Sequence, residues 1–157
     1  MSPKIIPAAE LMPHYEELLE AGAELPLVIS GTSMTPFLRP GIDTVYLKKP
    51  EGMLRPGEIA FFHRMDGSHV LHRVWKTESG MYWFLGDAQD LVEGPLPEKS
   101  VFAYVTKIDR DGVSVTPKDR LWRFFAGPWR LTRGTRRRFW LRLWNIPRKL
   151  RRLKKEK

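Results

Sequence analysis

The 157-residue sequence contains no cysteine. This absence excludes disulfide bonds, thiolate metal centres and cysteine nucleophiles. Proteins without disulfides occur on either side of a membrane, so the absence does not define the compartment. The length fits one globular domain of ordinary size with an appendage.

Long apolar segments are missing as well. A helix that spans a membrane needs about 20 predominantly apolar residues, and no stretch of the sequence provides them. The N-terminal region also lacks the apolar core of a secretory signal peptide, because it is interrupted by Glu10, Glu16, Glu17, Glu20 and Glu24. We therefore expect a cytoplasmic protein without a membrane anchor.

Acidic residues are scarce near the C-terminus. Residues 1–117 contain 11 Lys/Arg and 16 Asp/Glu, a net charge of −5, whereas residues 118–157 contain 16 Lys/Arg and 2 Asp/Glu, a net charge of +14. This asymmetry predicts a basic tail that meets an anionic surface, either a membrane or a nucleic acid. With a membrane as the partner, the protein is peripheral to the inner membrane surface.

Hydrophobic periodicity divides the chain into three regions. Residues 1–24 contain an amphipathic helix over 8–21, which we expect to begin near Pro13 because proline is unfavourable inside a helix. Residues 25–117 alternate short apolar runs with turn signals such as Asp66-Gly67, a pattern that predicts a mainly β domain of barrel or sandwich type. The expected strands are 25–29, 43–47, 58–63, 69–76, 81–85, 101–108 and 113–116.

Residues 118–157 combine tryptophan and arginine at helical spacings of three and four. This combination, in segments too short to span a bilayer, favours interfacial helices on anionic lipid. The residues expected to contact the membrane or another anion are Trp122, Trp129, Arg137, Trp140 and Trp144. One alternative is a helix packed on the domain with its charges in water. Nucleic-acid binding is less favoured, because no groove-reading motif is present.

Ser33 and His72 are the candidate nucleophile and general base. Ser33 lies between an apolar strand and a proline-containing turn, where most serines only cap the turn. A serine hydroxyl becomes a useful nucleophile when a base lies within hydrogen-bond reach. His72 lies within an expected strand and shares its face with Val70 and Val74, so its imidazole has apolar neighbours. A half-buried structural histidine is the alternative interpretation.

Asp87 is the candidate acid that orients the histidine. It follows Gly86 at the end of the strand that we expect to pair with the strand of His72. A carboxylate bonded to the imidazole would fix its tautomer and stabilise the imidazolium. An Asx-turn is the structural alternative for Gly-Asp. Asp90 and Glu93 lie close by and could serve instead.

Five segments, in order along the chain, resemble the conserved boxes of type I signal peptidases and their repressor-autoprotease relatives. Val70–Val74 is similar to the His-Arg-Val box of the archaeal and endoplasmic-reticulum branch, in which histidine stands where bacterial leader peptidases carry lysine. Gly31–Pro36 resembles the box that contains the nucleophilic serine. The other three segments are 38–43, 55–62 and 84–89.

The resemblance implies a signal-peptidase-like, β-rich fold and a serine endopeptidase that cleaves leader or precursor peptides. Ser33 would attack the peptide carbonyl, His72 would take and return the proton, and the backbone N–H of Ser33 would stabilise the oxyanion. Substrates would carry small residues before the scissile bond and would bind in extended form on a sheet edge. We expect no cofactor and no metal.

Two features depart from the family. We expect no membrane anchor, whereas family members usually have one. Gly31 occupies a position where many members have a serine that donates to the oxyanion, and Ser30 or Thr32 could replace that donor. Loss of one such donor costs on the order of 10²–10³ in rate. The alternative function is therefore a non-catalytic or self-cleaving regulatory module that binds peptides, with a tail that contacts membrane or nucleic acid.

Overall fold

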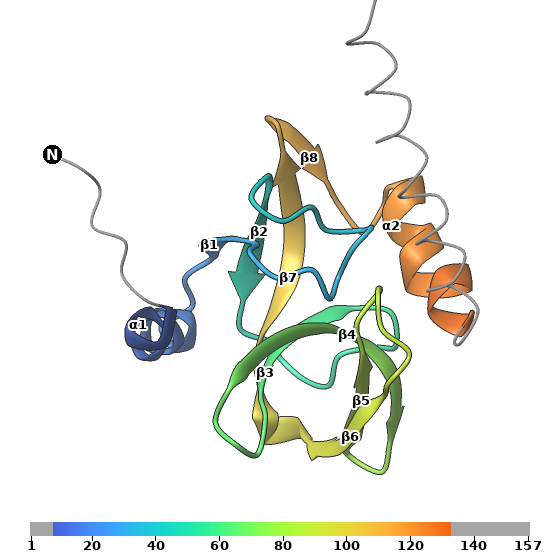
Figure 1. Cartoon of the computed structure of the whole chain (residues 1–157). Helices are drawn as coiled ribbons and strands as arrows, with labels where there is room; N and C mark the ends of the chain where they lie inside the picture. Colours follow the sequence, from blue (N-terminus) through green and yellow to red (C-terminus); the bar gives the residue numbers. More distant parts are fainter. Residues whose placement is uncertain (1–7, 133–157) are drawn as a thin grey trace, which may run out of the picture.

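The computed structural model describes residues 8–132 (Figure 1). As the sequence predicts, this part of the chain is mainly β, with one antiparallel sheet of eight strands and a short N-terminal helix, α1 (Ala8–Glu20). The strands are β1 (Leu25–Val28), β2 (Asp43–Lys48), β3 (Ile59–His63), β4 (His69–Glu78), β5 (Met81–Leu85), β6 (Glu93–Pro97), β7 (Val101–Arg110) and β8 (Val113–Val115).

The strand order is β1-β2-β7-β3-β4-β5-β6, and β8 pairs with β7. The ten-residue β7 pairs with β3 near its beginning and with β2 over the rest of its length. Irregular registers at Tyr46/Leu47 and Phe61/Phe62 interrupt these two pairings, and such bulges bend a sheet. Figure 1 shows the result, in which β3 to β6 curl into a strongly curved lobe below β2 and β8.

Two clusters of buried apolar residues hold the sheet in this shape. One cluster combines Met12 and Leu19 of α1 with Phe37, the inner residues of β2 and the later part of β7. The other lies inside the curved lobe, where the rings of Phe62 and Phe84 stack at 3.9 Å between centroids. Residues of β7 contribute to both clusters, so the two halves of the sheet share a continuous strand.

Strand β6 was not expected, because Gly94-Pro95-Leu96-Pro97 has the composition of a loop. The structure places this segment at the end of the strand order, where β5 is its one pairing partner among the described residues. An edge strand has one side free of ladder hydrogen bonds, so proline is tolerated there. The expectation of a loop is therefore wrong, and the strand that replaces it begins with Glu93.

Helix α1 begins at Ala8 and contains Pro13, so the expected start near Pro13 is also wrong. Proline removes one backbone hydrogen bond, whereas residues on both sides of Pro13 supply the contacts that hold the helix. Met12 and Leu19 are 2 % and 1 % exposed, and the Tyr15 hydroxyl donates to the Pro26 carbonyl at 2.7 Å. The stability gained from these tertiary contacts therefore outweighs the cost of the backbone hydrogen bond that Pro13 removes.

The chain continues after β8 into α2 (Arg120–Phe124) and a π-helical turn, η2 (Phe125–Trp129). Trp122 and Trp129 are buried at 3 % and 8 % exposure, and the ring of Phe37 meets those of Trp122 and Phe125 at 5.3 and 5.1 Å. Both tryptophans belong to the domain core, which corrects their expected role as membrane contacts. Arg137, Trp140 and Trp144 lie outside the described residues.

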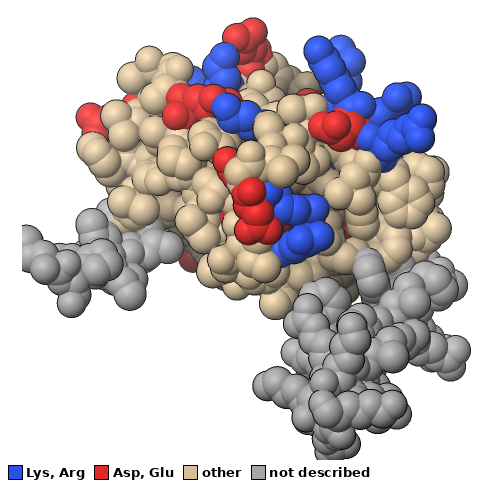
Figure 2. Space-filling model, turned by 90° about the horizontal axis from the view of Figure 1, so that it is seen from above, with Lys and Arg blue, Asp and Glu red and all other residues tan. Residues whose placement is uncertain are grey.

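The basic excess also lies outside the described region. Residues 8–132 contain 14 Lys/Arg and 17 Asp/Glu, whereas residues 133–157 contain 12 Lys/Arg and one Glu. Figure 2 shows basic and acidic side chains interspersed on one face of the described domain, with no large area of one sign. Within residues 8–132, no helix has the length and apolar character needed to cross a membrane.

Candidate active site

Ser33 lies in the loop between β1 and β2, pressed against the turn that follows β5. Its carbonyl accepts a hydrogen bond from the Ala88 N–H at 2.9 Å. Gly86 lies beneath this contact, where a Cβ atom would come within 2.7 Å of the Ser33 carbonyl oxygen. The glycine of the 84–89 segment therefore permits a close approach that fixes the Ser33 backbone.

His72 lies in the middle of β4, paired with Ala60 of β3. Its side chain is 2 % exposed, and Nδ1 lies 3.0 Å from Oε1 of Glu93. The two atoms are at ion-pair distance but are not aligned as a good hydrogen bond, and Nδ1 has no other hydrogen-bond partner among the described residues. Glu93 is therefore the carboxylate that the fold brings to this imidazole.

Glu93 is itself held by Arg64, which follows β3. Arg64 donates from Nε to Oε2 at 2.5 Å and from a terminal nitrogen to Oε1 at 2.6 Å. This two-bond clamp, which orients a carboxylate firmly, is the main reason that the pKa of Glu93 is lowered. The clamp keeps Glu93 ionised and fixes the oxygen that faces His72.

Burial lowers the pKa of His72 from 6.5 to about 4. The charge of Glu93 opposes this change, and the nearby charge of Arg64 adds to it. Desolvation dominates because the imidazolium loses its hydration inside the sheet. The imidazole is therefore neutral near pH 7, which is the state that can accept a proton.

Ser33 and His72 both line one groove with a volume of about 910 Å³. One wall is formed by β1 and the loop after it, and the other by the hairpin of β3 and β4. Arg64 and Gln89 also reach this surface. The structure thus brings the candidate nucleophile and base to the same concave surface.

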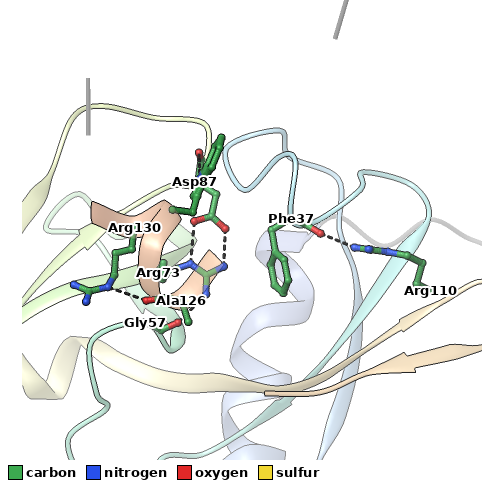
Figure 3. A network of polar contacts seen from close by, with 8 residues as sticks. Phe37, Gly57, Arg73, Asp87, Arg110, Ala126 and Arg130 are labelled. Carbon is green, nitrogen blue, oxygen red and sulfur yellow. Dashed lines mark hydrogen bonds and ion pairs between the residues drawn. The ribbon is translucent and has the colours of Figure 1, made fainter. Parts of the chain in front are cut away.

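Asp87 does not serve as the partner of His72. Its carboxylate is 1 % exposed and accepts two hydrogen bonds from Arg73, at 2.9 Å from Nε and 2.6 Å from a terminal nitrogen. The remaining terminal nitrogen of Arg73 donates to the Gly57 carbonyl at 2.7 Å (Figure 3). The buried guanidinium of Arg73 donates to both oxygens of Asp87, so the carboxylate that lies beside His72 is that of Glu93 and not that of Asp87.

The Arg73–Asp87 pair joins three of the five segments noted in the sequence. Arg73 comes from 70–74, Asp87 from 84–89 and Gly57 from 55–62. The Trp129 indole N–H donates to the Asp87 carbonyl at 3.0 Å, so η2 is tied to the same network. This network positions the turn that supports Ser33.

A second arginine–carboxylate pair, Arg110 with Asp43, supports the loop between β1 and β2 near its C-terminal end. Asp43 is fully buried and accepts hydrogen bonds from Arg110, at 2.8 Å from Nε and 2.5 Å from a terminal nitrogen. The same terminal nitrogen of Arg110 reaches the Phe37 carbonyl at 2.5 Å (Figure 3). The sequence analysis did not identify Arg73, Arg110 or Arg64. Arg73 and Arg110, which lie inside or beside expected strands, pair with buried carboxylates.

The remaining predicted site residues have different positions. Ser30 and Gly31 line the groove, whereas the Thr32 carbonyl accepts bonds from the N–H and hydroxyl of Thr35 at 3.1 and 2.7 Å. Asp90 is half-buried in the loop between β5 and β6 and is not among the residues that line the groove. Ser30 is thus the better placed of the two expected hydroxyl donors.

A comparison of the chain with protein-family models finds no matching family, and a comparison with curated proteins finds no matching relative.

Proposed function

We propose that this protein is a serine endopeptidase in which Ser33 is the nucleophile, His72 the general base and Glu93 the group that orients His72. One observation carries the proposal: Ser33 and His72 line the same groove, and the buried His72 has Nδ1 3.0 Å from a clamped carboxylate. The sequence resemblance to signal peptidases adds support for the same two residues.

The polar groups suit acyl transfer. With a proton on Nδ1 facing Glu93, the lone pair on Nε2 remains to accept the proton of the Ser33 hydroxyl. The serine oxygen then attacks the scissile carbonyl, and the new imidazolium gives its proton to the leaving amine. Water, deprotonated by His72, hydrolyses the resulting ester and frees Ser33.

The developing oxyanion needs preorganised donors. The backbone N–H of Ser33 is the first candidate, and the hydroxyl of Ser30, which lines the groove, is the second. Gly31 has no heavy atom within 4 Å of where a Cβ would stand, so the loop leaves space for the serine that family members carry there.

The groove also suits an extended peptide. Within residues 8–132, strand β1 lies at one end of the sheet and pairs with β2 alone. Apart from the Pro26 carbonyl, which accepts from the Tyr15 hydroxyl, its other edge is available for main-chain hydrogen bonds. Leu27, Val28 and Ile29 line the groove, so an incoming strand would meet an apolar wall beside Ser33. We propose leader or precursor peptides with small residues before the scissile bond as substrates.

The first experiment compares wild type with Ser33→Ala on a library of peptides that vary before the scissile bond, read by mass spectrometry. We expect cleavage by wild type and a loss of at least about 10³ in rate for the variant, because the nucleophile is removed. Ser114→Ala, an exposed serine on β8, is the matched control and keeps full activity. Equal peptide binding without cleavage by both proteins would contradict the peptidase and favour the peptide-binding module.

We further propose that the enzyme works at an anionic membrane surface through its basic C-terminal residues. This proposal rests on sequence charge, with 12 Lys/Arg and one Glu in residues 133–157. A basic residue near such a surface contributes about 1 kcal/mol of attraction.

A further inference from the structure

We propose that Glu16, His63 and His69 form a zinc site that joins α1 to the β3–β4 hairpin. Oε1 of Glu16 lies 3.1 Å from Nε2 of His63 and 3.3 Å from Nε2 of His69. The candidate ligand atoms of the three residues all lie within 4.8 Å of one another. One oxygen and two nitrogens from three separate places in the sequence therefore converge on one point.

The spacing of these atoms fits tetrahedral coordination. Zinc binds imidazole nitrogen and carboxylate oxygen at about 2.0–2.2 Å, which places neighbouring ligand atoms of a tetrahedron about 3.3 Å apart. The two nitrogen–oxygen separations, 3.1 and 3.3 Å, already have this length. A metal would need only small side-chain rotations to bind all three residues.

The backbone presents the two histidines together. His63 and His69 are register partners at the end of the β3–β4 pairing, so their side chains stand on the same face of the sheet. Their ring centroids lie 4.5 Å apart, and both rings pack against Phe102 of β7, at 4.7 and 5.6 Å. These contacts restrict ring motion, which is the preorganisation that a metal site requires.

The hairpin turn holds this register. The Arg64 N–H donates to the Ser68 carbonyl at 2.9 Å, and Asp66 accepts from both the backbone N–H and the hydroxyl of Ser68. The turn therefore fixes the last pair of the hairpin, and Glu16 is carried to it by the helix that packs on the same sheet.

Two imidazoles and one carboxylate form a nitrogen–oxygen ligand set that suits zinc. All three side chains are between 23 % and 34 % exposed, so an ion can enter from solvent. Three protein ligands leave a fourth position for water. Because His69 also lines the groove, the bound ion would fix α1 and one groove wall in place; this inference does not depend on the peptidase proposal.

The test is isothermal titration of the full-length, tag-free protein with zinc chloride. The chain has no cysteine and four histidines. Besides His63 and His69, His14 also lies near a glutamate of α1, at 3.9 Å from Glu17. We expect one zinc ion per chain for wild type and at least about tenfold weaker binding for Glu16→Gln and for His69→Asn, because each loses a ligand. Glu17→Gln is the matched control and binds as wild type does.

Wild type that binds no zinc, or Glu16→Gln that binds zinc as tightly as wild type, would overturn the proposal. If a variant folds poorly, the visible spectrum of wild type with cobalt(II) in place of zinc still decides. We expect the intense visible bands of tetrahedral cobalt(II). The weak spectrum of the hydrated cobalt ion would contradict the proposed site. The Ser33→Ala protein should bind zinc normally, which separates this result from any failure of the peptidase proposal.

Discussion

At the scale of single residues, the candidate site depends on which carboxylate meets which cation. The fold contains two arginine–carboxylate forks close to the site, Arg73 with Asp87 and Arg64 with Glu93. The first pair is fully buried and structural. In the second pair, Arg64 lines the groove and Glu93 carries the oxygen that lies beside His72. The sequence favoured Asp87 and kept Asp90 and Glu93 as alternatives, because spacing along the chain does not reveal which arginine pairs with which acid.

Glu93→Gln and Asp87→Asn should therefore fail in different ways. We expect Glu93→Gln to lower kcat/KM by about 10²–10⁴, because the imidazole loses its orienting carboxylate. Asp87→Asn should instead lower the free energy of unfolding by about 3–5 kcal/mol, because Arg73 is left buried without its counter-charge.

Peptide cleavage kinetics and urea unfolding of both variants measure the two effects. Equal losses of stability in the two variants, with unchanged kcat/KM for Glu93→Gln, would contradict the assignment of Glu93.

The neutral state of His72 also affects stability at low pH. Its pKa falls from 6.5 in the unfolded chain to about 4 in the fold, so between these values the unfolded chain binds more protons. Folding stability is therefore lost as the pH falls from 6.5 through 4, by about 3 kcal/mol over the whole range. His72→Gln should remove this part of the acid sensitivity.

Urea unfolding at pH 7 and pH 4.5 checks the expectation for wild type and variant. Because the pKa of Glu93 is also lowered, both proteins retain some loss of stability in acid. A variant as acid-sensitive as wild type would show that His72 is not buried in the neutral form.

At the scale of elements, short apolar runs bounded by turn signals were enough to predict seven strands and a mainly β fold. It could not predict β6, since its composition of glycine and proline indicates a loop and only its place at a sheet edge permits pairing. Glu93 is the first residue of this strand. Because the strand could not be predicted, the position of the Glu93 carboxylate beside His72 could not be predicted either. The docking of α2 and η2 was hidden for a different reason, because an amphipathic tryptophan-rich segment has the same pattern whether its apolar face meets lipid or a core.

The turn after β5 gives a prediction at this scale. In Gly86→Ala the new Cβ would approach the Ser33 carbonyl oxygen to 2.7 Å. It would therefore displace the loop between β1 and β2, which carries Ser33. We expect kcat/KM to fall at least about tenfold, since small displacements of a reacting group are costly.

Gly52→Ala is the control, because a Cβ at that position meets no heavy atom within 4 Å. Full activity of Gly86→Ala, measured on the same peptide, would show that the contact between the turn and the loop is not needed for catalysis.

At the scale of the whole molecule, the net positive charge is concentrated in residues 133–157 of the sequence. The described residues carry a small acidic excess, and 12 of the 27 Lys/Arg lie in residues 133–157. The expected anion contacts included Trp122 and Trp129, which the structure places in the core instead.

Membrane binding should therefore depend on the last residues and on salt. Replacement of Arg136, Arg137 and Arg138 by glutamine should weaken binding to phosphatidylglycerol vesicles by about 10²-fold, at about 1 kcal/mol for each charge. Replacement of Lys48 and Lys49, which lie at the end of β2 and just after it, should change binding little. Vesicle sedimentation at low salt measures both, and equal binding to neutral vesicles would contradict an electrostatic attachment.

The central claim is that His72 activates Ser33, and covalent labelling with a fluorophosphonate tests it most directly, because this probe needs no knowledge of the substrate. In the reaction the serine oxygen bonds to phosphorus, fluoride leaves and His72 takes the hydroxyl proton. Intact mass and peptide mapping should find one adduct per chain, on Ser33, and a rate of labelling at least about 10²-fold lower in His72→Gln. Absence of an adduct on Ser33, or labelling that is equally fast without His72, would contradict the account.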